Sequence, residues 1–115
     1  MLVNRQKLYE KAEDFFQFDG DAVMKLDRDA AIEVCSVAAA QGLVVVKIEG
    51  GIWCSGNFEA RLDAIWNGSH PPMNKSNAHV NNLFAINFIN QRNDAYNAFI
   101  ITTAPLTGFG HNEGR

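Results

Sequence analysis

Cys54 and the three histidines His70, His79 and His111 are the residues of this chain that could support nucleophilic catalysis. A catalytic thiol needs a base within hydrogen-bond reach and a further group that orients the base. No motif in the sequence places a histidine in that relation to Cys54. The other cysteine, Cys35, falls among apolar residues with helical spacing and is expected to pack in the core. We therefore predict that the chain has no catalytic residue and is not an enzyme.

The spacing of candidate ligands does not support a metal or cofactor site. The two cysteines stand nineteen positions apart, with neither the paired spacing nor the neighbouring histidines of a zinc site. The glycine clusters Gly50-Gly51 and Thr107-Gly-Phe-Gly110 lack the spacing of a phosphate-binding loop or a dinucleotide fingerprint. We interpret both clusters as turns and expect no metal and no cofactor.

The charge of the chain argues against direct nucleic-acid binding. Its 115 residues include ten Lys and Arg against thirteen Asp and Glu, whereas non-specific nucleic-acid binding normally needs a basic surface. Asparagines between 81 and 93 could read bases, but few basic residues accompany them, which favours a solvated helix face. Because the chain lacks a membrane-length apolar run and a secretory signal pattern, we expect a cytoplasmic protein without a membrane partner.

Length and apolar content are those of one domain. We expect residues 24–107 to form it, with a helical arm at 1–23 and a C-terminal tail at 108–115. Apolar residues of the arm recur on one face of a helix of about twelve residues: Leu8, Ala12, Phe15 and Phe16. These side chains are expected to bury against the domain or against a second copy of the chain in a homodimer.

A helix over 28–41 is the best-marked element of the domain. Asp27 can cap its N-terminus, and Gly42 stands where a left-handed residue ends a helix. The β-branched run 43–49 predicts a strand, and Gly50-Gly51 predicts a tight turn into a short returning strand.

Alternation of apolar and polar residues predicts a half-buried strand over 58–66. Its inward set is Phe58, Ala60, Leu62, Ala64 and Trp66. A helix over 78–92 follows, capped by Asn77, with an inward set of Val80, Leu83, Phe84, Ile86, Phe88 and Ile89. With a last strand over 96–103, the predicted class is α+β: a small, mostly antiparallel sheet with helices on one face, in the order α, α, β, β, β, α, β.

Seven segments stand in an order and at spacings typical of one family: Met24-Lys-Leu, Ala30-Ala-Ile-Glu-Val-Cys35, Gly42-Leu43, Glu49-Gly-Gly-Ile-Trp53, Asn81-Asn82, Ala85-Ile86 and Ala98-Phe-Ile-Ile-Thr102. Over about 24–103 the chain thereby resembles the immunity proteins of the E-group colicin that cleaves tRNA anticodons. The resemblance implies a compact α/β fold without catalytic activity. It also implies a protein partner, the nuclease domain of a toxin, whose anticodon groove the immunity protein occupies.

The resemblance makes the polar side of the central strands a candidate binding surface. Five charged side chains could share one sheet face: Lys47, Glu49, Glu59, Arg61 and Asp63. A groove shaped for phosphates and bases can accept carboxylates in place of phosphates and tryptophan as a stacking group. We predict that Glu49, Trp53, Glu59 and Asp63 bind the partner and that Trp66 packs in the core. The alternative for the charged residues is a solvated face with ordinary cross-strand ion pairs.

Two functions stay open at this point. The leading interpretation is a bacteriocin immunity protein that binds and inhibits a tRNA-cleaving toxin nuclease. The alternative is a small-molecule-binding or structural module, since a fold does not fix a function. A deep apolar pocket with a few converging polar groups would favour that alternative.

Overall fold

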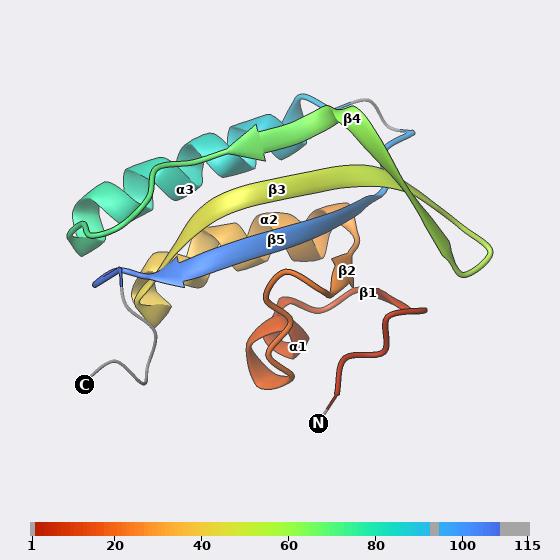
Figure 1. Cartoon of the computed structure of the whole chain (residues 1–115), viewed down its shortest axis with the longest axis horizontal. Coiled ribbons are helices and arrows are strands. Elements are labelled where there is room, and N and C mark those ends of the chain that lie inside the picture. Colours follow the sequence, from red (N-terminus) through yellow and green to blue (C-terminus); the bar gives the residue numbers. More distant parts are fainter. Residues whose placement is uncertain (1, 93–94, 109–115) are drawn as a thin grey trace.

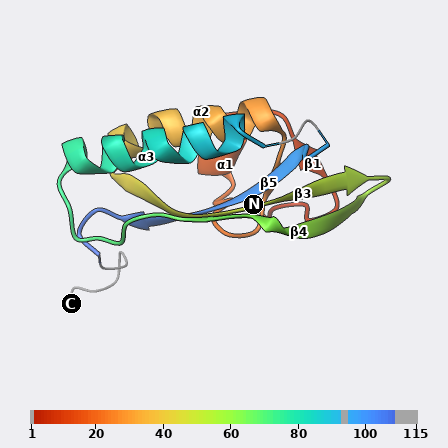
Figure 2. The same cartoon turned by 90° about the horizontal axis from the view of Figure 1, so that it is seen from above.

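One five-stranded sheet organises the protein, and the structure, a computed structural model, describes residues 2–92 and 95–108 (Figures 1 and 2). The strands are β1 (Leu8–Tyr9), β2 (Lys25–Leu26), β3 (Leu43–Cys54), β4 (Asn57–Asn67) and β5 (Ala98–Pro105). Their order across the sheet is β1-β2-β5-β3-β4, and all neighbours are antiparallel except β1 and β2. The predicted α+β class with a mostly antiparallel sheet is confirmed.

The helix α2 (Arg28–Ala38) begins where the sequence predicts but ends three residues earlier. Oδ1 of Asp27 accepts a hydrogen bond from the N–H of Ala30 at 2.8 Å, which satisfies a donor that the helix N-terminus leaves free. A 3₁₀ turn, η1 (Ala39–Gln41), continues the helix to Gly42, whose φ of 79° is left-handed. The helices α2 and α3 (Lys75–Asn90) lie side by side over one sheet face, as expected (Figure 2).

The face of α3 that turns inward differs from the predicted one. Its buried residues are Ala78, Asn81, Asn82, Ala85 and Ile89. The prediction that Val80, Leu83 and Phe84 lie inward is wrong, since these side chains are 51%, 48% and 62% exposed. The helix also begins earlier than expected, because Asn74 rather than Asn77 caps it and accepts a 2.8 Å hydrogen bond from the Asn77 N–H.

Two asparagine amides explain this orientation of α3. The pairing of β3 with β4 begins only at Lys47, so residues 43–46 of β3 have no strand on that side. There the N–H of Val45 donates to Oδ1 of Asn82 at 2.9 Å, and Nδ2 of Asn81 donates to the Val45 carbonyl oxygen at 2.8 Å. Because a buried backbone group without a partner is costly, Asn81 and Asn82 take inward positions. They therefore form neither the solvated face that we expected nor a base-reading surface.

The predicted turn at Gly50-Gly51 is wrong, because both glycines lie inside the continuous strand β3. The chain reverses instead at Ser55 and Gly56, which both have left-handed φ values, 52° and 82°. Glycine is needed within β3 for close packing. A Cβ at Gly51 would lie 2.2 Å from the carbonyl oxygen of Glu59, and one at Gly50 would lie 3.0 Å from Cβ of Ala64.

A bulge in β4 breaks the predicted alternation of this strand. Glu49 pairs with Ile65 and Gly51 with Ala60, so two steps along β3 correspond to five steps along β4. The three additional residues reverse the relation between sequence parity and sheet face. Ala64 is buried, but Leu62, predicted to face inward, is 91% exposed. Trp66 packs against the main core, as expected.

The first 23 residues contain β1 and a short helix, α1 (Ala12–Gln17), instead of the predicted helix of about twelve residues. Tyr9, Ala12 and Phe15 are buried in the main core, and Phe16 packs against it. Further along, Oδ1 of Asp21 accepts a 2.9 Å hydrogen bond from the Thr103 hydroxyl of β5. The apolar side chains of this segment thus pack on the same chain.

The core between the sheet and the helices is built from large apolar side chains of both layers. Fully buried examples are Met24, Leu26, Val34, Ile48, Ile89, Phe99 and Ile101. Burial of each such side chain contributes roughly 1.5–3 kcal/mol relative to exposure. This core fixes the long β3–β4 hairpin, whose tip projects beyond the helices (Figures 1 and 2).

Candidate partner-binding surface

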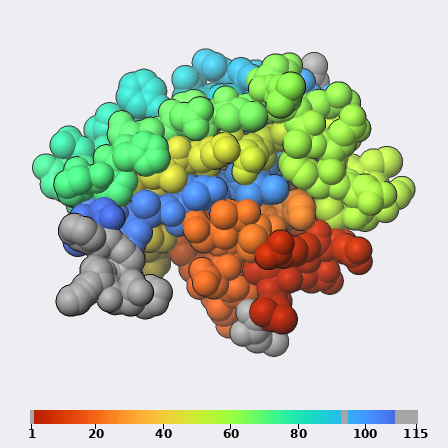
Figure 3. Space-filling model, viewed as in Figure 1, coloured from red at the N-terminus to blue at the C-terminus, as the bar shows by residue number. Residues whose placement is uncertain are grey.

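The sheet face away from the helices is open to solvent over β3 and β5 (Figure 3). Ile48 is fully buried in the core beneath the helices. Because side chains alternate along a strand, Glu49 and Trp53 lie on the opposite, open face. Nζ of Lys47 is 3.8 Å from Oε2 of Glu49, and these side chains are 42% and 37% exposed. The surface around Glu49 therefore carries an ion pair rather than an isolated carboxylate.

Trp53 lies near the projecting end of the hairpin, directly opposite Phe58 of β4. Its backbone N–H donates to Oδ1 of Asn97 at 2.7 Å. The residue before β5 therefore holds the backbone of Trp53 in place. The side chain is half-buried. A fixed backbone with a partly exposed ring suits an aromatic contact residue.

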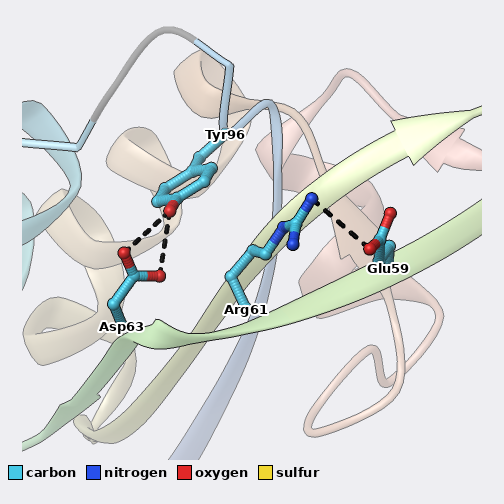
Figure 4. Close-up of polar contacts among 4 residues, drawn as sticks. All are labelled: Glu59, Arg61, Asp63 and Tyr96. Atoms are coloured by element: carbon cyan, nitrogen blue, oxygen red, sulfur yellow. Dashed lines mark hydrogen bonds and ion pairs between the residues drawn. The ribbon is translucent and has the colours of Figure 1, made fainter.

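Glu59 and Asp63 lie on the helix side of the hairpin. Glu59 is the register partner of Ile52, which has the same parity along β3 as the buried Ile48. Nη2 of Arg61 lies 3.3 Å from Oε2 of Glu59. The Tyr96 hydroxyl donates to the Asp63 carboxylate and lies 2.9 Å from both of its oxygens (Figure 4). This hydrogen bond raises the pKa of Tyr96 above its ordinary value.

The four predicted contact residues are therefore divided between two faces of the hairpin. Glu49 and Trp53 occupy the open face, whereas Glu59 and Asp63 occupy the helix side. The expectation that all the charged residues share one face is wrong, and the physical reason is the β4 bulge. Whether the four residues bind a partner stays a prediction.

Three residues that the sequence did not single out support this region. Nη1 of Arg92 donates to the backbone oxygen of Asp63 at 2.9 Å, and its guanidinium lies 4.5 Å from the ring centre of Phe88. Nη2 of Arg28 donates to the carbonyl oxygen of Tyr96 at 2.9 Å. The only sequence signal was the position of Arg28 in the first turn of α2, where the helix dipole disfavours a cation.

The two cysteines lie in different surroundings. Burial raises the pKa of the Cys35 thiol to about 12, and this confirms the expected core position. Cys54 is an exposed free thiol beside the hairpin turn. Within residues 2–92 and 95–108, no group of three or more His, Cys, Asp or Glu side chains could hold a metal ion. His111 and the second half of the other glycine cluster, Phe109 and Gly110, lie outside the described residues.

A hollow of about 430 Å³ lies between the end of β4 and α3, lined among others by Trp66, Asn81 and Phe84. It is open to solvent, and no charged side chain lines it. Such a shape differs from the enclosed apolar pocket that would favour the small-molecule alternative. None of the described helices is both long and apolar enough to cross a membrane.

Comparison with known proteins identifies the family of this chain. The family model described as "Colicin-E5 Imm protein" matches residues 24–104, from the residue before β2 to the last residue but one of β5. This chain belongs to the colicin-E5 immunity protein family. All four predicted contact residues lie inside the matched range, and so do Arg28, Arg92 and Tyr96.

Relatives of this immunity-family chain include proteins from two organisms. It is 45% identical over 109 residues to the immunity protein CdiI of Burkholderia pseudomallei, covering 95% of this chain and 100% of the relative. It is 42% identical over 80 residues to the colicin-E5 immunity protein of Escherichia coli, covering 69% of this chain and 96% of the relative. The longer match takes in most of the segment that forms β1 and α1, whereas the family model begins at Met24.

Proposed function

We propose that this protein is an immunity protein that binds a tRNA-cleaving toxin nuclease and inhibits it by occupying the RNA-binding groove. The family match over residues 24–104 carries the proposal, because it spans β2, α2, β3, β4, α3 and β5. The proposal is also supported by the match to the immunity protein CdiI of Burkholderia pseudomallei, which covers the full length of that relative.

The hairpin surface supplies the chemistry that this function needs. A nuclease groove for RNA is cationic, so its inhibitor should present carboxylates and flat apolar groups. Glu59 meets the first requirement, with a side chain that is 66% exposed although paired with Arg61. Trp53 meets the second on the open face. We propose that Glu49, Trp53, Glu59 and Asp63 contact the toxin.

The same proposal makes the protein a stoichiometric inhibitor without catalytic activity of its own. Its partner is a protein, and it does not contact nucleic acid directly, in keeping with the net charge of −3. It acts in the cytoplasm, where the tRNA that it protects is found. A homodimer is not required, since Tyr9, Ala12 and Phe15 pack in the core of their own chain.

The deciding experiment is tRNA cleavage by a panel of anticodon-nuclease domains, including that of colicin E5, with this protein titrated in. We expect cleavage by at least one domain to stop near an equimolar ratio. Trp53→Ala should raise the rate of dissociation from that domain, at a cost on the order of 2 kcal/mol if Trp53 is a central contact. Asn57→Ala, at an exposed position of the same hairpin, is the matched control.

Absence of protection against every domain of the panel would contradict the immunity function. Protection that survives substitution of all four contact residues would leave the function standing and reject the proposed surface.

A further inference from the structure

Leu62 is an exposed leucine inside a strand, in the β4 bulge. Its side chain is 91% exposed, although β4 runs from Asn57 to Asn67 on both sides of it. The two steps from Glu49 to Gly51 on β3 face five steps on β4, so the ladder itself does not fix the position of Leu62. Bulges of this kind re-aim a side chain and occur preferentially beside functional sites.

Two contacts fix the bulge from the segment between α3 and β5. Nη1 of Arg92 donates to the Asp63 backbone oxygen at 2.9 Å and thus replaces a ladder hydrogen bond. The Tyr96 hydroxyl holds the Asp63 carboxylate at 2.9 Å, and Nη2 of Arg28 holds the Tyr96 carbonyl oxygen. The bulge is therefore braced against both helices. A braced surface group loses little conformational freedom when it binds a partner.

The direction of Leu62 follows from its neighbours. Arg61 and Asp63 extend from the same side of the β4 ribbon, toward Glu59 and Tyr96 (Figure 4). Because side chains alternate along a strand, Leu62 is directed to the other side. That side is the open face of the sheet, where Trp53 lies. Leu62 thus extends the apolar part of the proposed contact surface.

We propose that Leu62 is an apolar anchor with which this protein docks on its toxin nuclease, and that Tyr96 is its positioning residue. The inference rests on the proposed function. Charge selects the partner. The projecting hairpin carries three carboxylates, Glu49 on the face of Leu62 and Glu59 and Asp63 on the other face. They outnumber its two cations, Lys47 and Arg61. By contrast, α3 bears other exposed apolar side chains, Val80, Leu83 and Phe84, but has no acidic residue. Of the two surfaces, the hairpin is the one that complements a cationic RNA-binding groove.

The experiment measures dissociation rates from a nuclease domain that the wild-type protein inhibits in the tRNA-cleavage assay. The variants are Leu62→Ala, Leu62→Met, Tyr96→Phe and the double variant of Leu62→Ala with Tyr96→Phe. Leu83→Ala on α3 is the matched control. Leu62→Ala should accelerate dissociation at least about tenfold, as for a desolvated anchor. Leu62→Met should stay close to the wild type, since it keeps the apolar volume. Leu83→Ala should leave the rate unchanged.

Tyr96→Phe tests the positioning role. It should accelerate dissociation about threefold in the wild-type background, because a looser bulge must be ordered on binding. In the Leu62→Ala background its effect should be clearly smaller, whereas a direct contact of Tyr96 would add its full increment. Thermal melting of each variant separates a binding defect from a folding defect. The melting temperature should not change for Leu62→Ala, since that side chain is almost fully exposed.

If Leu62→Ala dissociates from the nuclease domain at the wild-type rate, Leu62 is not an anchor. If Tyr96→Phe accelerates dissociation as much in the double variant as it does alone, Tyr96 is not a positioning residue. Both results leave the immunity function intact. If the wild-type protein inhibits no nuclease domain, the proposed function itself fails and the anchor fails with it.

Discussion

The guanidinium of Arg28 reaches from the first turn of α2 to the backbone oxygen of Tyr96, at 2.9 Å. It also donates to the carbonyl oxygens of Ile89, in the last turn of α3, and Arg92. The last carbonyl groups of a helix have no partners within the helix. Arg28 therefore completes the end of α3 and at the same time holds the residue that braces Asp63.

We expect Arg28→Ala to destabilise the protein. Several carbonyl oxygens would lose a charged donor in a partly buried position, and the free energy of unfolding should fall by about 2–3 kcal/mol. Urea unfolding followed by circular dichroism measures this change. Lys11→Ala, at an exposed position before α1, is the control and should have little effect. Equal stabilities of the two variants would show that the contacts of Arg28 contribute nothing net.

Asn82→Ala should also destabilise the protein, but through the backbone of β3. The Val45 N–H, which donates to Oδ1 of Asn82 at 2.9 Å, would be left buried without an acceptor. The expected loss in the free energy of unfolding is about 1–3 kcal/mol. Asn87→Ala, at an exposed position of the same helix, should change it by less than about 0.5 kcal/mol. The same denaturant titration distinguishes them, and similar losses would count against the edge-completing role.

Local signals in the sequence predicted α2 correctly, because Asp27 and Gly42 act on their own helix. Residues whose partners are remote in sequence cannot be placed in this way. Asn81 and Asn82 look like solvated residues until β3 lies beside them, and only that geometry makes their burial favourable. The β-branched run also predicted the first half of β3 correctly. Gly50-Gly51 has the sequence of a tight turn, and nothing local shows how closely Glu59 and Ala64 approach these two residues.

The position of the candidate surface on the β3–β4 hairpin could be predicted from the sequence, but its division between two faces could not. The carboxylates and Trp53 were found on the β3–β4 hairpin, because strand propensity and the family resemblance both indicated it. Their division between two faces depends on the register step between Ile65 and Ala60, which no local pattern encodes. The alternation of 58–66 is real in the sequence, but the bulge places Leu62 in solvent.

The two thiols should differ strongly in reactivity. Thiolate is the reactive form of cysteine, and burial raises the pKa of Cys35 to about 12, whereas Cys54 is exposed. We expect Ellman's reagent to modify one thiol of the native protein rapidly and the second only on unfolding. Cys54→Ser should abolish the rapid phase and leave the slow one. A rapid phase that persists in this variant would place Cys35 within reach of solvent.

The hydrogen bond between Tyr96 and Asp63 should be visible at alkaline pH. It favours the neutral phenol, so the pKa of Tyr96 in the folded protein lies above its ordinary value of 10.0. The stabilisation is therefore complete below that value and is lost as pH rises through the folded pKa. Tyrosinate absorbance in a Tyr9→Phe background reports Tyr96 alone, since the chain has two tyrosines. Asp63→Asn should lower the pKa toward its ordinary value, and an unchanged titration would contradict the contact.

Charge reversal at Glu59 should slow association with the toxin nuclease more than it speeds dissociation. The side chain is 66% exposed on the projecting hairpin, where it acts on the approach of a cationic partner rather than on a desolvated contact. Glu59→Lys should therefore reduce the association rate several-fold at low salt. The reduction should shrink as salt rises, because exposed charges are screened over about 8 Å at physiological ionic strength.

The matched control is Glu13→Lys on α1, whose segment packs at the opposite edge of the sheet from β4. It makes the same change in net charge, so any difference between the two variants reports position. Stopped-flow mixing at several salt concentrations gives the association rates. Equal slowing by both variants would mean that net charge alone steers the encounter. A salt-independent effect of Glu59→Lys would mean that Glu59 contributes through a desolvated contact, so that its carboxylate would not serve as an exposed substitute for a phosphate.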